Sequence, residues 1–462
     1  MIRTPTTRDY LAISLFWLGF SFFWGALLTS VLQERVQTFV KVEYSMSHPT
    51  YVAPPTDATN ALETRAQKEI EALQANRSGW LLASGALVSM LTQLVFGALS
   101  DNARSRWGRR KPFLVFGTLL ASLGVFAFPH AQNYAQLFAV FLWIQLFINV
   151  AAGPYSALLP DLIPAEFHGR AAAFMGFFSL VGRTGGMVAG ALALRGNSEI
   201  GLNALTIAFL VLLNGLMLAT ALMTHETPTH NTSSTRSFVD TFIGIFRVDL
   251  RGQSSFVWVL VSRFVINTGV YTILPFLLFY LISCYKLTKS DALAQIAVIG
   301  ILVNVMGLIA TFPAGLASDR TSKKNVLYVT CILCVIGGMG FVFSQSIGFA
   351  LLSAAIFGLG YGAFQAVDWA LICNVLPPGA PAKYMGLWSC ADTVPQIVAP
   401  FIGGAVASYF IQNFNASVGY RAVMFTAIVW FVLGTFVIRF VKERTAREIG
   451  GATKLDVMAE AV

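Results

Sequence analysis

The chain has 462 residues, of which 56% are hydrophobic and only 11% are charged. Soluble domains carry about 25% charged residues, so this composition excludes an ordinary soluble protein. The formal net charge of +9 is a signal of membrane topology rather than of nucleic-acid binding, because the basic residues gather in short loops between long apolar segments.

Those apolar segments follow one another along the whole chain. A helix needs about 20 apolar residues to cross a hydrocarbon core roughly 30 Å thick. The sequence predicts an all-α membrane protein with twelve such helices, six in each half, at residues 10–33, 79–100, 113–130, 134–159, 172–194, 204–224, 256–283, 296–317, 326–344, 347–375, 385–411 and 422–438.

The segments between these spans suggest how the chain is divided. The first apolar run is too long for a secretory signal and lacks a small-residue cleavage site, so we interpret it as an uncleaved span. Within the long outer loop 34–78, residues 61–74 favour a helix, which would be either a cap over the outer mouth or a plain spacer. We predict an amino-terminal bundle at 1–224, a cytosolic linker at 225–254 whose residues 238–246 fit a short interfacial helix, and a carboxy-terminal bundle with a short cytosolic tail at 255–462.

The basic residues predict the orientation. Most of the 31 lysines and arginines fall in loops on one side when both termini are placed in the cytosol, as the positive-inside rule requires. We therefore expect an integral protein of the plasma (inner) membrane with both termini in the cytosol.

Two short phrases occur twice, about half the chain apart. Residues 97–101 read Gly-Ala-Leu-Ser-Asp and residues 315–319 read Gly-Leu-Ala-Ser-Asp, and segment 157–164 has a similar counterpart at 370–377. Self-similarity at a fixed offset indicates an internal repeat, and two such halves in a membrane usually form a substrate path at their interface. The repeat therefore points to a transporter.

The first phrase opens a basic loop over residues 97–112, Gly-Ala-Leu-Ser-Asp-Asn-Ala-Arg-Ser-Arg-Trp-Gly-Arg-Arg-Lys-Pro. A glycine there allows helices to approach closely, and the aspartate can meet a helix N-terminus or an arginine. The loop resembles the signature loop of the major facilitator superfamily, which latches the cytosolic gate, and a weaker copy follows at 319–324. The resemblance implies a gate formed by Gly97, Asp101, Arg106, Gly108, Arg109, Arg110, Asp319 and Arg320.

The spacing between the aspartate and the Gly-Arg-Arg element is four residues longer than is usual in that superfamily. The sucrose transporters and the glycoside–pentoside–hexuronide symporters show the same extension. Segments 153–162 and 173–186 look like the corresponding stretches of the plant proton–sucrose symporters, and 24–27 agrees more loosely. Segments 368–371 and 395–400 resemble bacterial members of the group. The resemblance implies two pseudosymmetric six-helix halves and sugar transport.

Two positions depart from the sucrose-transporter pattern. Gln145 stands where the plant proteins carry the carboxylate that serves as the proton site, and Arg183 stands where they carry an asparagine. Both changes make the amino-terminal half of the cavity more positive, which favours either a neutral sugar with altered coupling or a sugar acid such as a hexuronide. Arg183 is expected to bind an anionic group or pair with Asp392, or else to reach gate carboxylates or carbonyls.

Few ionisable side chains lie within the predicted spans. The Asp, Glu, Lys and Arg residues at such depth are Arg183, Arg263, Asp368 and Asp392. Each costs at least a few kcal/mol there, so they pair or line a wet cavity. Arg263 and Asp368 lie at matching depths, which allows an ion pair between them. We expect Asp368, or alternatively Asp392, to couple transport to protons, with Arg183 and Arg263 as charge partners.

Polar side chains keep to stripes on the helices that would line a cavity. Sugars are typically held by such donors and acceptors above an aromatic ring, although polar residues also join membrane helices together. The expected substrate-binding residues are Trp24, Gln145, Asn149, Arg263, Asn267, Tyr271, Gln365 and Asp368.

These features favour a secondary transporter that moves a sugar, a disaccharide or glycoside similar to sucrose, by alternating access in symport with a proton. A uniporter or exporter of another small solute and a membrane sensor that transports nothing are the alternatives. We expect a monomer in the lipid bilayer with a small-molecule substrate, no nucleic-acid partner, no catalytic or metal-binding residues, and no cofactor apart from H⁺ as coupling ion.

Overall fold

The computed structural model describes residues 4–48, 61–194, 198–226, 252–377 and 380–443. All regular secondary structure in these ranges is helical. Twelve of the described helices are long and apolar enough to cross a membrane. The prediction of an all-α protein with twelve spans is confirmed.

The first half consists of the helices that precede residue 227. They are α1 (Thr7–Ala26), the π-helical segment η1 (Leu27–Val31), α2 (Leu32–Ser47), α3 (Ala61–Asp101), α4 (Lys111–Ala127), η2 (Phe128–His130), α5 (Tyr134–Ser156), α6 (Leu158–Leu162), η3 (Ala165–Phe167), α7 (His168–Ala193) and α8 (Ser198–Met223).

The second half begins after residue 251. Its helices are α10 (Ser254–Ile273), η4 (Leu274–Phe276), α11 (Leu277–Tyr285), α12 (Lys289–Arg320), α13 (Lys323–Phe343), α14 (Ile347–Val375), α15 (Pro381–Asn413) and α16 (Ala416–Ile438).

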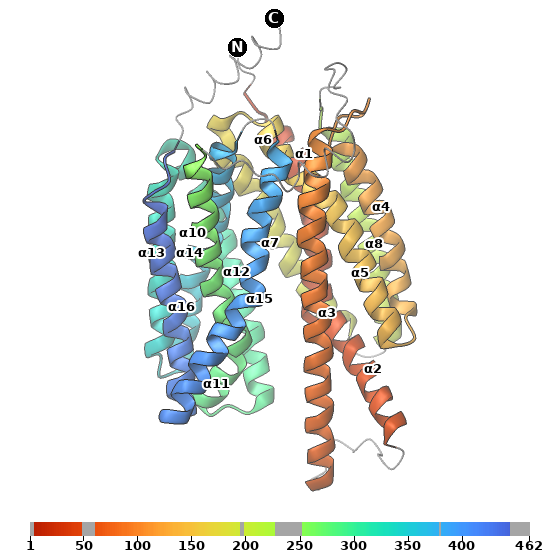
Figure 1. The fold of residues 1–462 in the computed structure, drawn as a ribbon, viewed down its shortest axis with the longest axis vertical. Coiled ribbons are helices and arrows are strands. Elements are labelled where there is room, and N and C mark those ends of the chain that lie inside the picture. The colour runs from red at the N-terminus through yellow and green to blue at the C-terminus, as the bar shows by residue number, and fades with distance from the viewer. Residues whose placement is uncertain (1–3, 49–60, 195–197, 227–251, 378–379, 444–462) are drawn as a thin grey trace, which may run out of the picture.

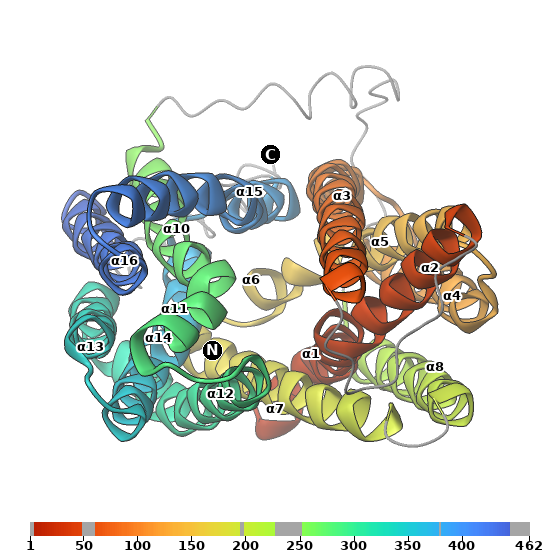
Figure 2. The same cartoon turned by 90° about the horizontal axis from the view of Figure 1, so that it is seen from below.

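The two halves form separate bundles that stand side by side, α1 to α8 in one and α10 to α16 in the other (Figure 1). Seen along the long axis, α7 lies beside α12 at one edge of the interface and α3 lies beside α15 at the other (Figure 2). These four helices form the seam between the halves, so residues on their inner faces are placed where the internal repeat predicts a substrate path.

The two ends of the molecule differ. One end carries the loop 102–110 between α3 and α4, and we call it the latch end. At the opposite end α2 and the first part of α3 project beyond the other helices (Figure 1), and we call it the stalk end. With 41 residues, α3 is about 60 Å long, roughly twice the thickness of a hydrocarbon core.

The amino-terminal region departs from the prediction. The sequence predicts a first span at 10–33, whereas α1 ends at Ala26 and runs through the π-helical segment into α2. The helix predicted at 61–74 is present, but it is the beginning of α3 and continuous with the second span, so it does not lie across the mouth. The helix predicted at 238–246 falls outside the described residues.

Glycines allow α1 and α7 to pack closely. A Cβ added at Gly182 or Gly186 would clash with the backbone of α1, and a Cβ added at Gly25 would clash with the backbone of Arg183. Small residues let membrane helices approach to this distance. The contact fixes the backbone of α7, and with it the base of the Arg183 side chain, against α1.

Candidate functional site

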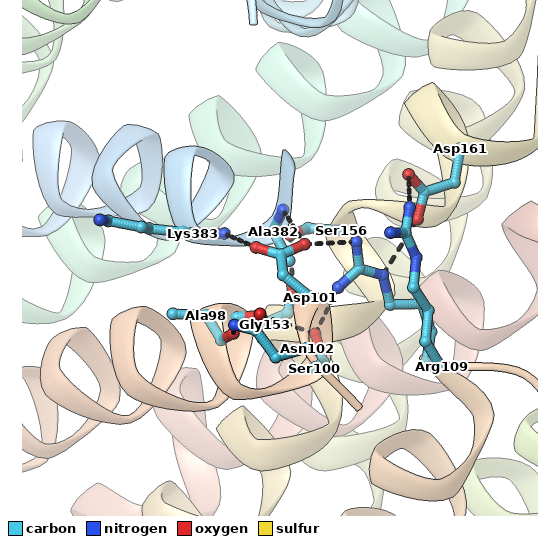
Figure 3. Close-up of polar contacts among 12 residues, drawn as sticks. Ala98, Ser100, Asp101, Asn102, Arg109, Gly153, Ser156, Asp161, Ala382 and Lys383 are labelled. Atoms are coloured by element: carbon cyan, nitrogen blue, oxygen red, sulfur yellow. Dashed lines mark hydrogen bonds and ion pairs between the residues drawn. The ribbon is translucent and has the colours of Figure 1, made fainter. Parts of the chain in front are cut away.

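A buried aspartate joins the two halves at the latch end. The Asp101 carboxylate, at the end of α3, accepts hydrogen bonds from the backbone N–H groups of Ala382 at 3.2 Å and Lys383 at 2.9 Å, at the beginning of α15 (Figure 3). Arg110 donates to the same carboxylate at 2.6 Å. Because a helix N-terminus presents free N–H groups and partial positive charge, a carboxylate is stabilised there. This contact closes one edge of the seam.

Arg110 organises the loop behind this aspartate. Its side chain is fully buried and donates to Asp161 at 3.0 Å and to Ser100 at 2.5 Å. Arg109 donates to the other oxygen of Asp161 at 2.7 Å (Figure 3). Two arginines thus face two aspartates, and this balance is what allows a guanidinium to be buried.

A further carboxylate caps the first turn of α4. Glu226, which follows α8, accepts hydrogen bonds from the backbone N–H groups of Arg110 at 2.8 Å and Lys111 at 3.1 Å. Burial raises the pKa of Glu226 above its ordinary value of 4.5. Gly108 has φ +99°, and a Cβ there would lie 2.5 Å from Glu226, so this position requires glycine.

The second half repeats the arrangement. Asp319, at 218 residues after Asp101, accepts hydrogen bonds from the backbone N–H groups of Gly169 at 2.8 Å and Arg170 at 3.0 Å, at the beginning of α7. Glu443 accepts hydrogen bonds from the first two N–H groups of α13 at 3.3 and 2.6 Å. The internal repeat therefore includes both carboxylate caps, and each half holds a helix of the other.

The residues missed by sequence reasoning in this region are Asp161, Arg170, Glu226 and Glu443. Each contacts its partner from a distant segment of the chain. Nothing in the local sequence shows that a residue after the sixth span of a half contacts the start of the third span of that half. A search for a second pair of carboxylates at the repeat offset would have found Glu226 and Glu443.

Two predicted gate residues lie outside these contacts. Arg106 and Arg320 are exposed, and within the described ranges neither makes a hydrogen bond or ion pair. Asp319 pairs instead with Arg170, whose Nε lies 3.3 Å from a carboxylate oxygen. Arg320 follows Asp319 directly in the sequence, but consecutive residues point to different faces of a helix, so it faces solvent.

A second cluster of charges lies at mid-depth in the second half. Arg263 on α10 forms an ion pair with Asp368 on α14, as the matching depths predict. The Arg263 guanidinium also lies 3.5 Å from Asp392 on α15, and its Cζ lies 3.7 Å from the ring centroid of Trp388. Asn267 donates to Asp392 at 2.6 Å. One guanidinium therefore serves two carboxylates and an aromatic ring.

The two carboxylates differ in their access to solvent. The Asp368 side chain is 3% exposed and also accepts a hydrogen bond from Nε1 of Trp388 at 3.3 Å. The Asp392 side chain is 28% exposed. Asp392 is therefore partly accessible, whereas Asp368 is sealed inside the bundle.

Further polar side chains gather around Asp392. Tyr271 accepts a hydrogen bond from Gln396 at 3.1 Å, and Gln365 donates to Tyr361 at 2.9 Å. Both tyrosine hydroxyls lie within electrostatic range of Asp392. The structure thus brings the predicted Asn267, Tyr271 and Gln365 to the inner face of the second half, together with two residues outside the predicted substrate-binding set, Tyr361 and Gln396.

The predicted residues of the first half are placed differently. Gln145 and Asn149 are 8% and 2% exposed. Asn149 accepts a hydrogen bond from Gln93 of α3 at 2.6 Å and donates to the Gln145 side chain at 3.2 Å. These amides join α3 to α5 and do not face an open cavity, and Trp24 packs among phenylalanine rings.

An aromatic floor of three tryptophans crosses the seam beside Asp368, on the latch side of Asp392. Trp17 of α1 meets Trp369 of α14 across the seam, with ring centroids 5.5 Å apart, and Trp369 meets Trp388 of α15 at 4.9 Å. The indole nitrogens of Trp17 and Trp369 are buried and have no hydrogen-bond partner among the described residues. These rings close the interface on the latch side of Asp392.

Arg183 is the mid-depth charge that stays apart. Its side chain is exposed, and in the ranges that the structure describes it makes no hydrogen bond or ion pair. Asp392 is held by Arg263 and Asn267. The predicted pairing of Arg183 with Asp392 is therefore not observed.

The fold and this arrangement agree with a comparison against protein families. Residues 10–400 match the Major Facilitator Superfamily. The chain belongs to the major facilitator superfamily. The resemblance of the latch loop to that superfamily is thereby confirmed, and because its members are membrane transporters, the chain stands among integral membrane transporters rather than enzymes.

Solved structures of the major facilitator fold are similar to this one over almost its whole length. The human organic anion transporter MFSD10 has a TM-score of 0.67 at 14% identity, over 94% of this chain and 98% of that chain. A bacterial homologue of the iron transporter ferroportin in an outward-facing state has a TM-score of 0.64 at 14% identity, over the same shares. At such low identity these likenesses show the fold alone.

Relatives within the major facilitator superfamily are metabolite transporters. The inner membrane metabolite transport protein YhjE of Escherichia coli (strain K12) is 30% identical over 158 residues, 34% of each chain. A probable 4-methylmuconolactone transporter of Cupriavidus pinatubonensis is 24% identical over 42% of this chain and 44% of its own. The chain thus spans between about a third and under a half of the length of these two curated relatives, and neither of their names specifies sucrose.

The structure of this major facilitator protein is closed at one end. Asp101 and Asp319 hold the latch end together, and the aromatic floor lies between that end and Asp392. Asp392 and Arg183 are nevertheless accessible to solvent. With the latch end closed, any solvent route to these residues runs from the stalk end.

Proposed function

We propose that this chain is a secondary transporter that moves a sugar, a disaccharide or glycoside similar to sucrose, in symport with a proton. The resemblance of segments 153–162 and 173–186 to the plant proton–sucrose symporters supports the substrate class. The hydroxyl and amide groups of α10, α14 and α15 support it as well, because a few convergent polar groups beside apolar ring faces are what a small polar ligand needs.

The observation that carries the proposal is the unequal exposure of Asp368 and Asp392, which share the Arg263 guanidinium. It decides which of the two carboxylates binds the proton. A proton on Asp392 leaves the buried pair of Arg263 and Asp368 intact. A proton on Asp368 would break that pair and leave a charge poorly compensated in a dry site, which is costly. Asp392 is therefore the proposed proton carrier and Asp368 its fixed neighbour, which reverses the order of preference from the sequence.

The proposed transport cycle starts from the observation that the latch end is closed. With the latch end in the cytosol, as the positive-inside rule favours, the structure is the outward-facing state, in which sugar and proton reach Asp392 from outside. Rocking of the halves then breaks the contacts of Asp101 and Asp319 and opens the floor toward the cytosol. By analogy with its Escherichia coli relative, the proposed location is the inner membrane.

The test is transport by the purified protein in proteoliposomes. A panel of sugars is added outside, and the pH change and the uptake of labelled sugar are measured together. Asp392→Asn should abolish accumulation driven by a pH gradient while exchange of sugar across the membrane persists. Asp291→Asn, a change at an exposed aspartate of α12, is the matched control and should leave accumulation unchanged.

Three outcomes distinguish the alternatives. Accumulation at the native level by the Asp392→Asn variant would contradict the assignment of the proton to Asp392. Uptake without any pH change would favour a uniporter. A sugar that stabilises the protein against heat but is never transported would favour a sensor.

A further inference from the structure

Arg183 is a cation near the middle of the membrane that forms no ion pair within the described ranges. It lies ten residues from the end of α7 at Ala193, a depth of about 15 Å. Its side chain is exposed, and among the described residues it has no ion pair or hydrogen bond. An arginine at such depth costs several kcal/mol unless it pairs or lines a wet cavity, so the direction in which it points matters.

The pattern of exposure along α7 shows that this direction is inward. Val181, Val188 and Leu192 are 38%, 45% and 56% exposed and form the outer stripe of the helix. Successive residues of an α-helix are about 100° apart, which places Arg183 on the side opposite to that stripe. The hydroxyl of Tyr361, in the other half, lies within electrostatic range of Arg183.

The neighbours of Arg183 on α7 agree with this placement. Gly182 and Gly186 pack against α1 on one flank. Met187 approaches Gly300 of α12 on the other. Arg183 lies between these two contacts and therefore faces the space between the halves. The clash that a Cβ at Gly25 would make with the Arg183 backbone shows that the base of the side chain is fixed there.

The charges at mid-depth sum to zero only when Arg183 is included. Arg263, Asp368 and Asp392 together carry one negative charge, and Arg183 carries one positive charge. Starting from this sum of zero, a proton on Asp392 alone gives a net charge of +1, and a bound monoanion alone gives a net charge of −1. The empty cavity and the cavity that holds both are neutral. Moving a net charge through a low-dielectric membrane interior is costly, so these two states are the ones best able to change conformation.

We propose that Arg183 binds the carboxylate of a solute that carries a single negative charge, and that the protein transports this solute together with one proton in an electrically neutral step. This inference rests on the proposed function, because it uses Asp392 as the proton carrier. It narrows the substrate class from sugars in general to sugars or sugar-like solutes with one carboxylate.

A matched pair of probes tests the inference. p-Nitrophenyl β-D-glucuronide carries a carboxylate where p-nitrophenyl β-D-glucoside carries a hydroxymethyl group, and the two are otherwise alike. In proteoliposomes, uptake of the glucuronide should follow an imposed pH gradient and should not respond to a membrane potential set by potassium and valinomycin. Arg183→Gln should lower glucuronide uptake by at least about tenfold, the loss expected for a charged hydrogen bond, and should leave glucoside uptake within about twofold.

Two further variants guard against a merely structural effect. Arg183→Lys retains the charge and should keep glucuronide uptake well above that of Arg183→Gln. Arg8→Gln, at an exposed arginine in the first turn of α1, should change neither probe. All variants are compared at equal amounts of monodisperse protein.

The outcomes separate this inference from the proposed function. Proton-coupled uptake of the glucoside alone, equal effects of Arg183→Gln on both probes, or glucuronide uptake driven by the membrane potential would each overturn the inference and leave the proposed function standing. Failure to transport the pair or any sugar of the panel would overturn both.

Discussion

Arg263 is the side chain on which the mid-depth cluster depends. It neutralises the buried Asp368, reaches Asp392 and lies over the Trp388 ring. Its Nε is buried without a partner among the described residues, so its two terminal nitrogens make the contacts with the acids. Within this trio two acids share one cation, so the loss of Arg263 leaves two negative charges side by side, whereas the loss of either acid leaves one ion pair.

A double-mutant cycle measures this dependence. Arg263→Ala should lower the free energy of unfolding by about 3–5 kcal/mol, since it leaves Asp368 buried and unpaired. Arg263→Ala combined with Asp368→Ala should be more stable than Arg263→Ala alone, as judged by thermal unfolding in detergent. The exposed pair of Arg77 and Glu43 on the stalk end is the control cycle, with an expected coupling of about 1 kcal/mol or less. Additive losses at Arg263 and Asp368 would mean that the pair contributes nothing as a pair.

At the scale of helices, the latch consists of two helix starts, each held by an aspartate from the opposite half. Asp101 holds α15 and Asp319 holds α7, but the two are not equal. The arginine that supports Asp101 is fully buried, whereas the arginine beside Asp319 is 40% exposed. A Cβ at Gly97 would lie 2.6 Å from the Ala382 carbonyl oxygen, so α3 and α15 are also pressed together at this point.

Opening of the latch should expose a native cysteine. Cys373 lies near the latch end of α14 and is 7% exposed in the closed state. Asp101→Ala removes a helix cap worth about 1 kcal/mol or more, so the reaction of Cys373 with a maleimide should be roughly fivefold faster, with a smaller effect for Asp319→Ala. Peptide mass spectrometry measures both rates.

Cys331 is the internal control for this experiment, because it is fully buried within the second half and should react slowly in every variant. Turnover should fall in Asp101→Ala while substrate affinity changes little. A large loss of affinity with unchanged turnover would argue against a gating role for Asp101.

At the scale of the whole molecule, the two halves have kept some features of the repeat and lost others. The carboxylate caps occur in both halves at nearly the same offset. The mid-depth charges do not repeat: the first half supplies Arg183 and the second supplies Arg263, Asp368 and Asp392. Both halves therefore contribute the same kind of gate contact, whereas the charged side chains at mid-depth differ between the halves.

The orientation of the molecule can be tested with single cysteines. Ser45 on α2 and Arg106 in the latch loop are both exposed, and they lie at opposite ends. A membrane-impermeant maleimide should label Ser45→Cys in intact cells and should label Arg106→Cys only after permeabilisation, both against the background of the unmodified chain. The reverse pattern would place the latch end outside and would make the observed state inward-facing.

How much of the structure can be predicted from the sequence depends on how far apart in the chain the interacting residues lie. The spans, the repeat and the pairing of Arg263 with Asp368 follow from patterns within single helices and from matching depths. The direction of an isolated side chain does not, because a rotation of one residue moves it by about 100° around a helix. This is why Gln145 and Asn149 turn out to be buried between helices, and why Arg320 faces solvent. Contacts between distant loops, such as that of Glu226 with α4, leave no local signal.

Because α3 is long, a small tilt near one end of the helix becomes a large displacement of the other end. Its contact with α15 at Gly97 lies near one end, and the helix continues without a break for 36 residues to Ala61, a distance of about 54 Å. A tilt of about 10° around the contact would sweep the far tip through roughly 9 Å. A fluorophore at that tip would therefore magnify small movements at the latch into changes of distance that single-molecule energy transfer can follow while the protein works.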